Sequence, residues 1–314
     1  MEFSRQYLVK IAQETNFIKD TLEKVVRLAE ILKFLNNDNI FKGKLALKGG
    51  TAINLTAVEL PRLSVDIDLD FTENVSREEL FEVKERFSKR LTDYMWQEGY
   101  SLGDSRDYFA LSSYLFNYIN AAGNRDNIKI EINYLDRLHV LPLENKRLLT
   151  KGIIDNFDVL TLNVTELYAS KINALLSRAT PRDLYDVNSM LENGIELDMN
   201  LLRKCLLFYN VIGGDYDLEN LAYDNVKRLD YKKFKTQLKP VIAKDDKFDI
   251  EKAKEKVISY LRELIVLTPE EKEFIKRFNE KDYRPELLFG AGEIANNLIN
   301  HPAARWRCMD KKEN

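Results

Sequence analysis

The chain has 314 residues, of which 45% are hydrophobic and 32% are charged, and its net charge is −3. Such a chain can bury a full core and has room for two domains. Two cysteines and two histidines exclude a disulfide framework and argue against zinc chemistry. The near-neutral charge neither indicates nor excludes nucleic-acid binding, because a local basic groove is sufficient for it.

The apolar pattern predicts a mixed region of helices and strands, followed by a helical region. Residues 4–37 carry apolar side chains at three-and-four spacing, as an amphipathic helix does. Residues 77–98 predict a charged helix that begins with a capping box of Ser76 and Glu79. From Thr165 onward, nearly all of the sequence predicts helix. The other expected elements are strands at 45–47, 64–71, 108–120, 127–135 and 157–163, a hairpin loop at 122–126 and a helix that opens at Thr51 or Ala52.

These elements predict an α+β fold, in which a mixed sheet with helices precedes a mainly helical domain. We expect the first domain, with its N-terminal helices, at residues 1–163 and the second at 164–314. The N-terminal residues Met1–Arg5 lack the apolar core of a signal peptide, and no apolar run is long enough to span a bilayer. The sequence therefore predicts a cytoplasmic protein with no membrane partner.

Two glycines and a threonine, Gly49-Gly50-Thr51, stand between an expected strand and an expected helix. Glycines permit unusual backbone angles and close approach, and a helix N-terminus attracts anions. The Thr51 hydroxyl would add a donor to a phosphate. The glycine spacing fits neither a P-loop nor a dinucleotide fingerprint. The alternative is a tight turn with a threonine N-cap.

Three aspartates, Asp66, Asp68 and Asp70, occupy alternate positions of one short apolar run. In a strand they all point to one face, and the apolar residues between them point to the other. Like charges this close repel one another, and a divalent cation relieves that repulsion. We predict that Asp66 and Asp68 bind Mg²⁺, which suits carboxylates together with substrate phosphates. The alternative is an exposed edge strand whose charges resist aggregation.

Glu131 alternates with isoleucines in a later expected strand and shares a face with Lys129 and Asn133. If this strand pairs beside the aspartate strand, Glu131 can approach the same metal ion. The alternative is a solvated polar face.

A later segment predicts two helices joined by a turn, with Thr180 as the N-cap of the second helix. Lys171 and Arg178 share a face of the first helix, and Asp183 and Asp186 share a face of the second. A lysine here could contact a triphosphate and an aspartate could orient it. Taken without further information, these residues favour a surface network of salt bridges. Near the C-terminus, His301 is expected to pack against Trp306 rather than to act as a base.

The order of these signals carries more information than any one of them. A strand, Gly-Gly-Thr, a helix, an Asp-x-Asp strand and a later acidic strand follow one another as in a nucleotidyltransferase site. The sequence resembles the AbiEii/AbiGii toxin family of the nucleotidyltransferase superfamily. The resemblance rests on Leu47–Ala52, on Arg62–Leu69, on Lys171, Arg178 and Arg182–Asp186, and more loosely on His301-Pro302 and Trp306.

The resemblance implies a nucleotidyltransferase fold and assigns roles to the matched residues. Asp66 and Asp68 would bind magnesium, and Lys171 and Asp186 would complete the catalytic set with Asp183 beside them. Glu131 is our geometric candidate for a third metal ligand and not a family position. The expected nucleotide-binding residues are Lys48, Gly49, Gly50, Thr51, Arg62 and Ser64.

The resemblance also implies a toxin of a bacterial toxin–antitoxin or phage-defence module. Some members of the family transfer nucleotides from an NTP to the 3′ end of tRNA. We therefore expect Mg²⁺-assisted transfer of a nucleotide to an RNA acceptor, with a cognate antitoxin as a candidate partner. The alternatives are transfer to a small molecule or a protein hydroxyl, and a non-catalytic nucleotide-binding module whose metal site is vestigial.

Overall fold

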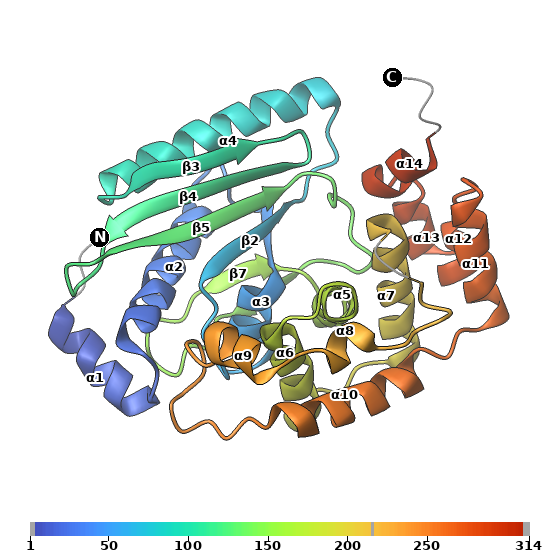
Figure 1. Cartoon of the computed structure of the whole chain (residues 1–314). Helices are drawn as coiled ribbons and strands as arrows, with labels where there is room; N and C mark the ends of the chain where they lie inside the picture. Colours follow the sequence, from blue (N-terminus) through green and yellow to red (C-terminus); the bar gives the residue numbers. More distant parts are fainter. Residues whose placement is uncertain (1–3, 215–216, 310–314) are drawn as a thin grey trace. The chain divides into compact units, whose positions relative to one another are not determined.

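The computed structural model describes residues 4–214 and 217–309 (Figure 1). The sequence predicts no signal peptide at the N-terminus, and residues Met1–Phe3 of that segment lie outside the described residues. Two compact units divide the chain. Unit 1 takes its described residues from Met1–Arg137, Leu143–Thr161 and Lys239–Asp246, and unit 2 from Leu138–Pro142, Leu162–Leu238 and Lys247–Asn314. Compared with a single cut after residue 163, residues 138–142 and 162–163 fall in unit 2, and residues 239–246 fall in unit 1.

Unit 1 is built on a seven-stranded mixed sheet with the strand order β3-β4-β5-β2-β1-β7-β6. β2 runs antiparallel to β1 on one side and parallel to β5 on the other. This confirms the α+β class. The strands are β1 (Leu45–Lys48), β2 (Asp66–Phe71), β3 (Ser101–Asp107), β4 (Leu111–Ile119), β5 (Arg125–Asn133), β6 (Glu144–Arg147) and β7 (Asp158–Thr161).

The apolar face of the sheet packs against two long helices, α2 (Lys19–Asn37) and α4 (Arg77–Gln97) (Figure 1). The ring of Phe71 on β2 lies 5.9 Å from that of Phe87 on α4. Helix α4 begins at the expected capping box, in which the Glu79 N–H donates to the Ser76 hydroxyl. The aspartates of β2 therefore lie on the face opposite to this core.

Several element bounds differ from the sequence-based expectation for local reasons. The helix expected over 4–37 is two helices, α1 (Arg5–Thr15) and α2, because Asn16 takes a left-handed conformation that ends α1. Strand β3 is missed because all of its side chains are exposed, and β6 because it is short and polar. Neither strand carries the apolar alternation that marks a buried strand.

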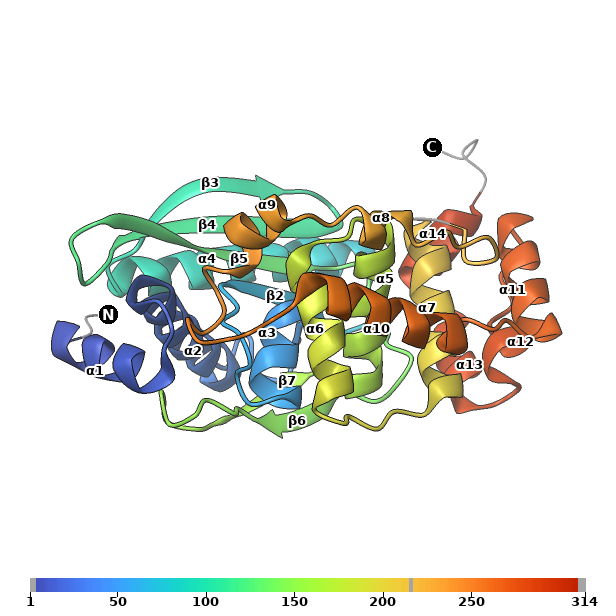
Figure 2. The same ribbon diagram turned by 60° about the horizontal axis from the view of Figure 1, so that its bottom comes forward.

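Unit 2 is helical. Figure 2 shows α10 running across α6 and α7, and α5 packs against both α6 and α7. None of the described helices is both long and apolar enough to cross a bilayer. The helices are α5 (Val164–Ser177), α6 (Pro181–Glu192), α7 (Met199–Gly213), α8 (Asp224–Lys227), α9 (Tyr231–Lys233), η2 (Phe234–Leu238), α10 (Ile250–Leu264), α11 (Pro269–Asn279), α12 (Pro285–Phe289), α13 (Glu293–Leu298) and α14 (Pro302–Cys308).

The expected packing of His301 against Trp306 is wrong. The His301 ring is fully buried and stands edge-on to Phe208, with 5.1 Å between the ring centroids. Trp306 is 61% exposed. The Nδ1 atom of His301 accepts a hydrogen bond from the Ala304 N–H and so caps α14, which gives His301 a structural role.

Glu166 on α5 joins the short segment 138–142 to unit 2. Its buried carboxylate accepts hydrogen bonds from the N–H groups of Val140 and Leu141, both at 2.9 Å, and from the Tyr209 hydroxyl. Glu166→Ala leaves these backbone donors without their acceptor, so we expect it to lower the free energy of unfolding by about 1–3 kcal/mol. Urea denaturation measures this loss, and the exposed Glu196→Ala serves as the control with little expected change. Equal effects of the two variants would refute the role of Glu166.

Candidate active site

Asp68 lies in the middle of a polar row that crosses three strands. It stands opposite Lys48 on β1 and opposite Glu131 on β5. Residues paired across neighbouring strands share a face of the sheet, so these three side chains project from the same face. The alternative of a charged edge strand is excluded, because β2 lies between β1 and β5.

The glycine turn approaches the aspartate strand directly. Gly49 has a φ of +67°, and a Cβ atom at this position would lie 2.7 Å from Oδ2 of Asp68. A Cβ on Gly50 would lie 2.8 Å from Nη2 of Arg62 and 3.2 Å from Oγ of Ser64. The fold therefore brings together Gly49, Gly50, Asp68, Arg62 and Ser64, and the positive φ of Gly49 favours glycine at that position.

Thr51 connects the turn to β2 through its own hydroxyl. The side chain is fully buried, and the hydroxyl donates a hydrogen bond to the backbone carbonyl of Asp66. The expected contact of this hydroxyl with a phosphate stays a prediction. Within the protein, Thr51 holds the start of α3 (Gly49–Ala52) and the following turn η1 (Ile53–Ala57) against the start of β2.

Lys48 neutralises part of the acidic face. Its Nζ lies 2.5 Å from Oδ1 of Asp70 and 3.8 Å from Oδ2 of Asp136. Burial by itself would lower the pKa of Lys48, but these two carboxylates outweigh it, and the pKa is raised above its ordinary value. Lys48 is therefore charged at neutral pH, and Asp70 serves as its buried partner.

Asp136 was not singled out from the sequence. It lies three residues beyond β5 and accepts a hydrogen bond from Nδ2 of Asn133 at 2.7 Å. The only sequence signal is an acidic residue soon after an acidic strand. The pairing of β5 with β2 is needed to show that this residue follows a strand next to the aspartate strand.

The acidic face offers two half-buried carboxylates, Asp66 and Asp68, as metal ligands. Among the residues that the structure describes, no three histidine, cysteine or acidic side chains lie close enough together to hold a metal ion. Glu131 instead forms an ion pair with Lys129, at 2.8 Å. A pair of carboxylates suits Mg²⁺, which commonly takes its remaining ligands from water and substrate phosphates.

In unit 2, Lys171 of α5 forms a buried ion-pair cluster with two aspartates of α6. Its Nζ lies 3.0 Å from Oδ1 of Asp183 and 3.0 Å from Oδ2 of Asp186. The network expected on the surface is therefore buried, and only Arg178 of the group is exposed. Thr180 caps α6 as expected, and Asp183 completes the capping box. Burial by itself would raise the pKa of Asp183. The charge of Lys171 and the hydrogen bonds from Lys171 and Thr180 outweigh burial, and the pKa is lowered.

A comparison with models of known protein families identifies the family of this chain. The model of the nucleotidyl transferase AbiEii toxin family, a type IV toxin–antitoxin system, matches residues 33–256, well over half of the chain. The chain belongs to the AbiEii nucleotidyltransferase toxin family. The expected resemblance and the expected enzyme class are thereby confirmed. A toxin of such a system implies an antitoxin and a nucleotide substrate.

A solved structure supports the fold of this AbiEii family member. The nucleotidyltransferase toxin MenT4 from Mycobacterium tuberculosis is similar to it with a TM-score of 0.67, over 89% of this chain and 97% of that chain. The two sequences are 17% identical, so this similarity concerns the fold. A search of curated proteins finds no match.

Gly49→Ala should inactivate the site of this AbiEii family member. The new Cβ would meet the Asp68 carboxylate, and a displacement on the order of 1 Å can cost about 10²-fold in rate. The positive φ adds a destabilisation of about 1–2 kcal/mol. Nucleotidyl transfer and urea denaturation measure the two effects.

Gly43→Ala is the matched control for Gly49→Ala. Gly43 also has a positive φ, of +76°, but a Cβ there would meet no atom within 4 Å. It should share the loss of stability and keep full activity. If both variants lost activity equally, backbone strain rather than contact with Asp68 would be responsible.

Proposed function

We propose that this AbiEii toxin transfers a nucleoside monophosphate from an NTP to the 3′-hydroxyl of an RNA, with release of pyrophosphate and with tRNA as the expected acceptor. The observation that carries the proposal is the approach of the Asp68 carboxylate to the glycine turn, where a Cβ on Gly49 would lie 2.7 Å from Oδ2. A carboxylate beside a glycine turn can serve a metal ion that is shared with a triphosphate.

Asp66 and Asp68 would hold Mg²⁺ on the polar face of β2. Bound there, the ion would neutralise the triphosphate and polarise the α-phosphate that the acceptor hydroxyl attacks. Glu131, directly opposite Asp68 on β5, is proposed as a third carboxylate for the same ion, in addition to its ion pair with Lys129. The family membership supports divalent-metal chemistry in general.

The glycine turn would bind the triphosphate through the backbone. Because Gly49 and Gly50 have no side chains, the backbone of the turn comes close to Asp68 and Arg62, and it would approach the phosphates in the same way. Arg62 and Ser64 lie behind Gly50 and present a guanidinium and a hydroxyl to it. Lys48 would add positive charge at the same edge, and Thr51 positions the turn through its bond to Asp66.

Unit 2 contributes Lys171, Asp183 and Asp186 to the proposal through the family motif. Within unit 2, Asp183 and Asp186 hold the Lys171 ammonium from two sides. This arrangement supports a positioning role, because a lysine fixed by two carboxylates keeps its charge and its orientation. We place the reaction in the cytoplasm, where NTPs and RNA acceptors are found together.

The test is incubation of the protein with Mg²⁺ and α-³²P-labelled NTPs, together with separate pools of RNA, protein extract and small-molecule alcohols. Label on RNA 3′ ends supports the proposal. Label only in protein or small molecules would replace the RNA acceptor by one of those two classes. No label in any pool, with NTP binding retained, would favour a non-catalytic module.

A further inference from the structure

A basic surface with one exposed aromatic ring lies on α9 and η2 of unit 2. We call Tyr231, Lys232, Lys233 and Lys235 the α9 surface, and all four side chains are exposed. Tyr231 is 64% exposed, so its ring is open to solvent. Nothing assigned to the site so far uses these residues.

The lysines of the α9 surface have no acidic partners. Within the described residues, none of their three ammonium groups lies within ion-pairing distance of a carboxylate. The one acidic residue of this segment, Asp230, caps α9, since its side chain accepts a hydrogen bond from the Lys233 N–H at 2.7 Å. The positive charge of this surface is therefore available to a polyanion.

The exposed ring is held in place by a row of aromatic side chains. Tyr231 lies 5.5 Å from Phe234, which stacks on Phe248 at 6.1 Å, and Phe248 lies 5.1 Å from Tyr185. Tyr185 is the neighbour of Asp186 on α6, and η2 packs against α6. The outer end of the row is thus a supported, solvent-facing platform.

We propose that the α9 surface binds single-stranded RNA, with one base stacked on Tyr231 and the backbone phosphates on Lys232, Lys233 and Lys235. This inference rests on the proposed function and identifies where the acceptor strand is held. Stacking on an exposed aromatic ring beside lysines is how proteins bind single strands without reading their sequence. A duplex offers no free base face, so the geometry favours an unpaired end.

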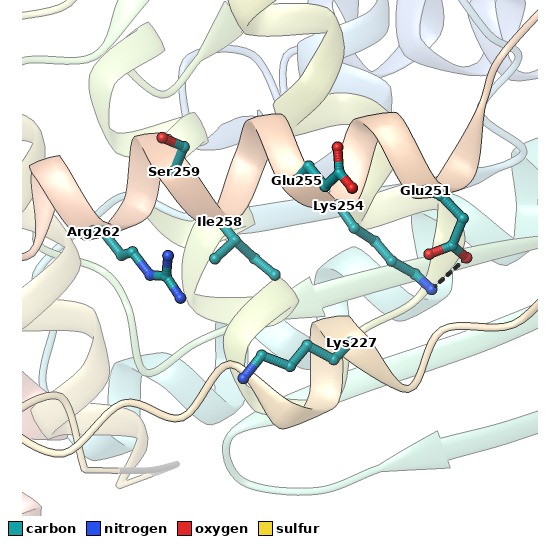
Figure 3. A pocket seen from close by; sticks show the side chains of 7 residues that line it. All are labelled: Lys227, Glu251, Lys254, Glu255, Ile258, Ser259 and Arg262. Atoms are coloured by element: carbon teal, nitrogen blue, oxygen red, sulfur yellow. Dashed lines mark hydrogen bonds and ion pairs between the residues drawn. The ribbon is translucent and has the colours of Figure 1, made fainter.

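A basic pocket elsewhere in unit 2 is less suited to RNA. A pocket of about 380 Å³ between α8 and α10 contains the cations Lys227, Lys254 and Arg262 (Figure 3). Two carboxylates share it, and Nζ of Lys254 donates to Oε1 of Glu251 at 2.8 Å. These carboxylates would repel phosphate, whereas the lysines of the α9 surface are not paired with any carboxylate that the structure describes, and the neighbouring Asp230 caps α9.

Binding of a short fluorescein-labelled single-stranded RNA, without NTP or metal, tests whether a base stacks on the Tyr231 ring. Tyr231→Ala should raise the Kd about 5- to 100-fold, the usual cost of one lost base stack. Tyr231→Phe keeps the ring and should bind as the wild type does. Tyr108→Ala, at another exposed tyrosine, is the control and should have no effect. An unchanged Kd for Tyr231→Ala, or a blunt duplex that shows the same Tyr231 dependence, would overturn the proposal.

The salt dependence of the same binding tests the lysines. The double variant Lys232→Ala, Lys235→Ala should reduce the slope of log K against log salt by about 1.4, because each single-strand phosphate contact contributes about 0.7. The charge-matched double variant Lys272→Ala, Lys276→Ala on α11 should leave the slope unchanged. Equal slopes for the two double variants would contradict the assignment.

Activity separates this inference from the proposed function. If RNA is labelled and Tyr231→Ala raises the KM for RNA without changing kcat, both stand. If RNA is labelled and Tyr231→Ala changes neither Kd nor KM, the α9 surface does not bind the RNA, and the proposed function still stands. If Tyr231 governs RNA binding but no RNA is labelled, the binding surface stands and RNA is not the acceptor.

Discussion

Replacing Asp66 and Asp68 by asparagine is expected to lower the rate of nucleotidyl transfer by about 10³-fold or more. Asparagine keeps the shape of each side chain but removes both negative charges, and metal-assisted charge stabilisation contributes several kcal/mol to the transition state. Both residues lie on β2, where Ile67 and Leu69 hold the strand in the core independently of the polar face. Single-turnover assays with labelled NTP measure the loss.

The fold should survive this double substitution. Removing two neighbouring like charges relieves their repulsion, so we expect the unfolding free energy to stay within about 1 kcal/mol of the wild type or to rise. Asp104→Asn, on the exposed edge strand β3, is the control for loss of an acidic residue and should keep full activity. Wild-type rates in the Asp66 and Asp68 variant would remove the metal site from the proposal.

Lys171→Met is expected to produce the largest loss of stability, about 3–5 kcal/mol. It leaves two buried carboxylates without their shared ammonium group, and breaking a buried ion pair from one side costs this much. Urea denaturation at neutral pH measures the change. In the combined variant Lys171→Met, Asp186→Asn one of the stranded charges is gone, so part of the stability should return.

The pH dependence of Lys171→Met has a defined sign. In the wild type the pKa of Asp183 is lowered, so its contribution to stability is present above the unfolded pKa of about 3.9 and is lost as pH falls through the folded pKa. In the variant, burial acts without the opposing charge of Lys171, so the pKa of Asp183 should be higher than in the wild type. The deficit should therefore be largest at neutral pH and shrink as pH falls. A deficit independent of pH would show that lost packing, not stranded charge, causes it.

Local patterns in the sequence were sufficient for the elements that carry the site. The alternation of Asp66 and Asp68 with apolar residues predicted a strand with one buried and one acidic face, and that strand is β2. The capping signals at Ser76 and Thr180 predicted the starts of α4 and α6. These features depend on residues close in sequence, through side-chain periodicity and hydrogen bonds to the next helical turn.

The partners of the charged side chains were decided by tertiary structure. Strand register placed Lys48 opposite Asp68, from where its ammonium group reaches Asp70, and burial turned the expected surface network around Lys171 into an internal one. The position of Gly49 against Asp68 likewise depends on the antiparallel pairing of β1 with β2. The sequence by itself determined the family, the acidic strand and the glycine turn. Only the tertiary structure decided which carboxylates meet cations and which meet the turn, because electrostatic and packing interactions depend on distances between residues far apart in the chain.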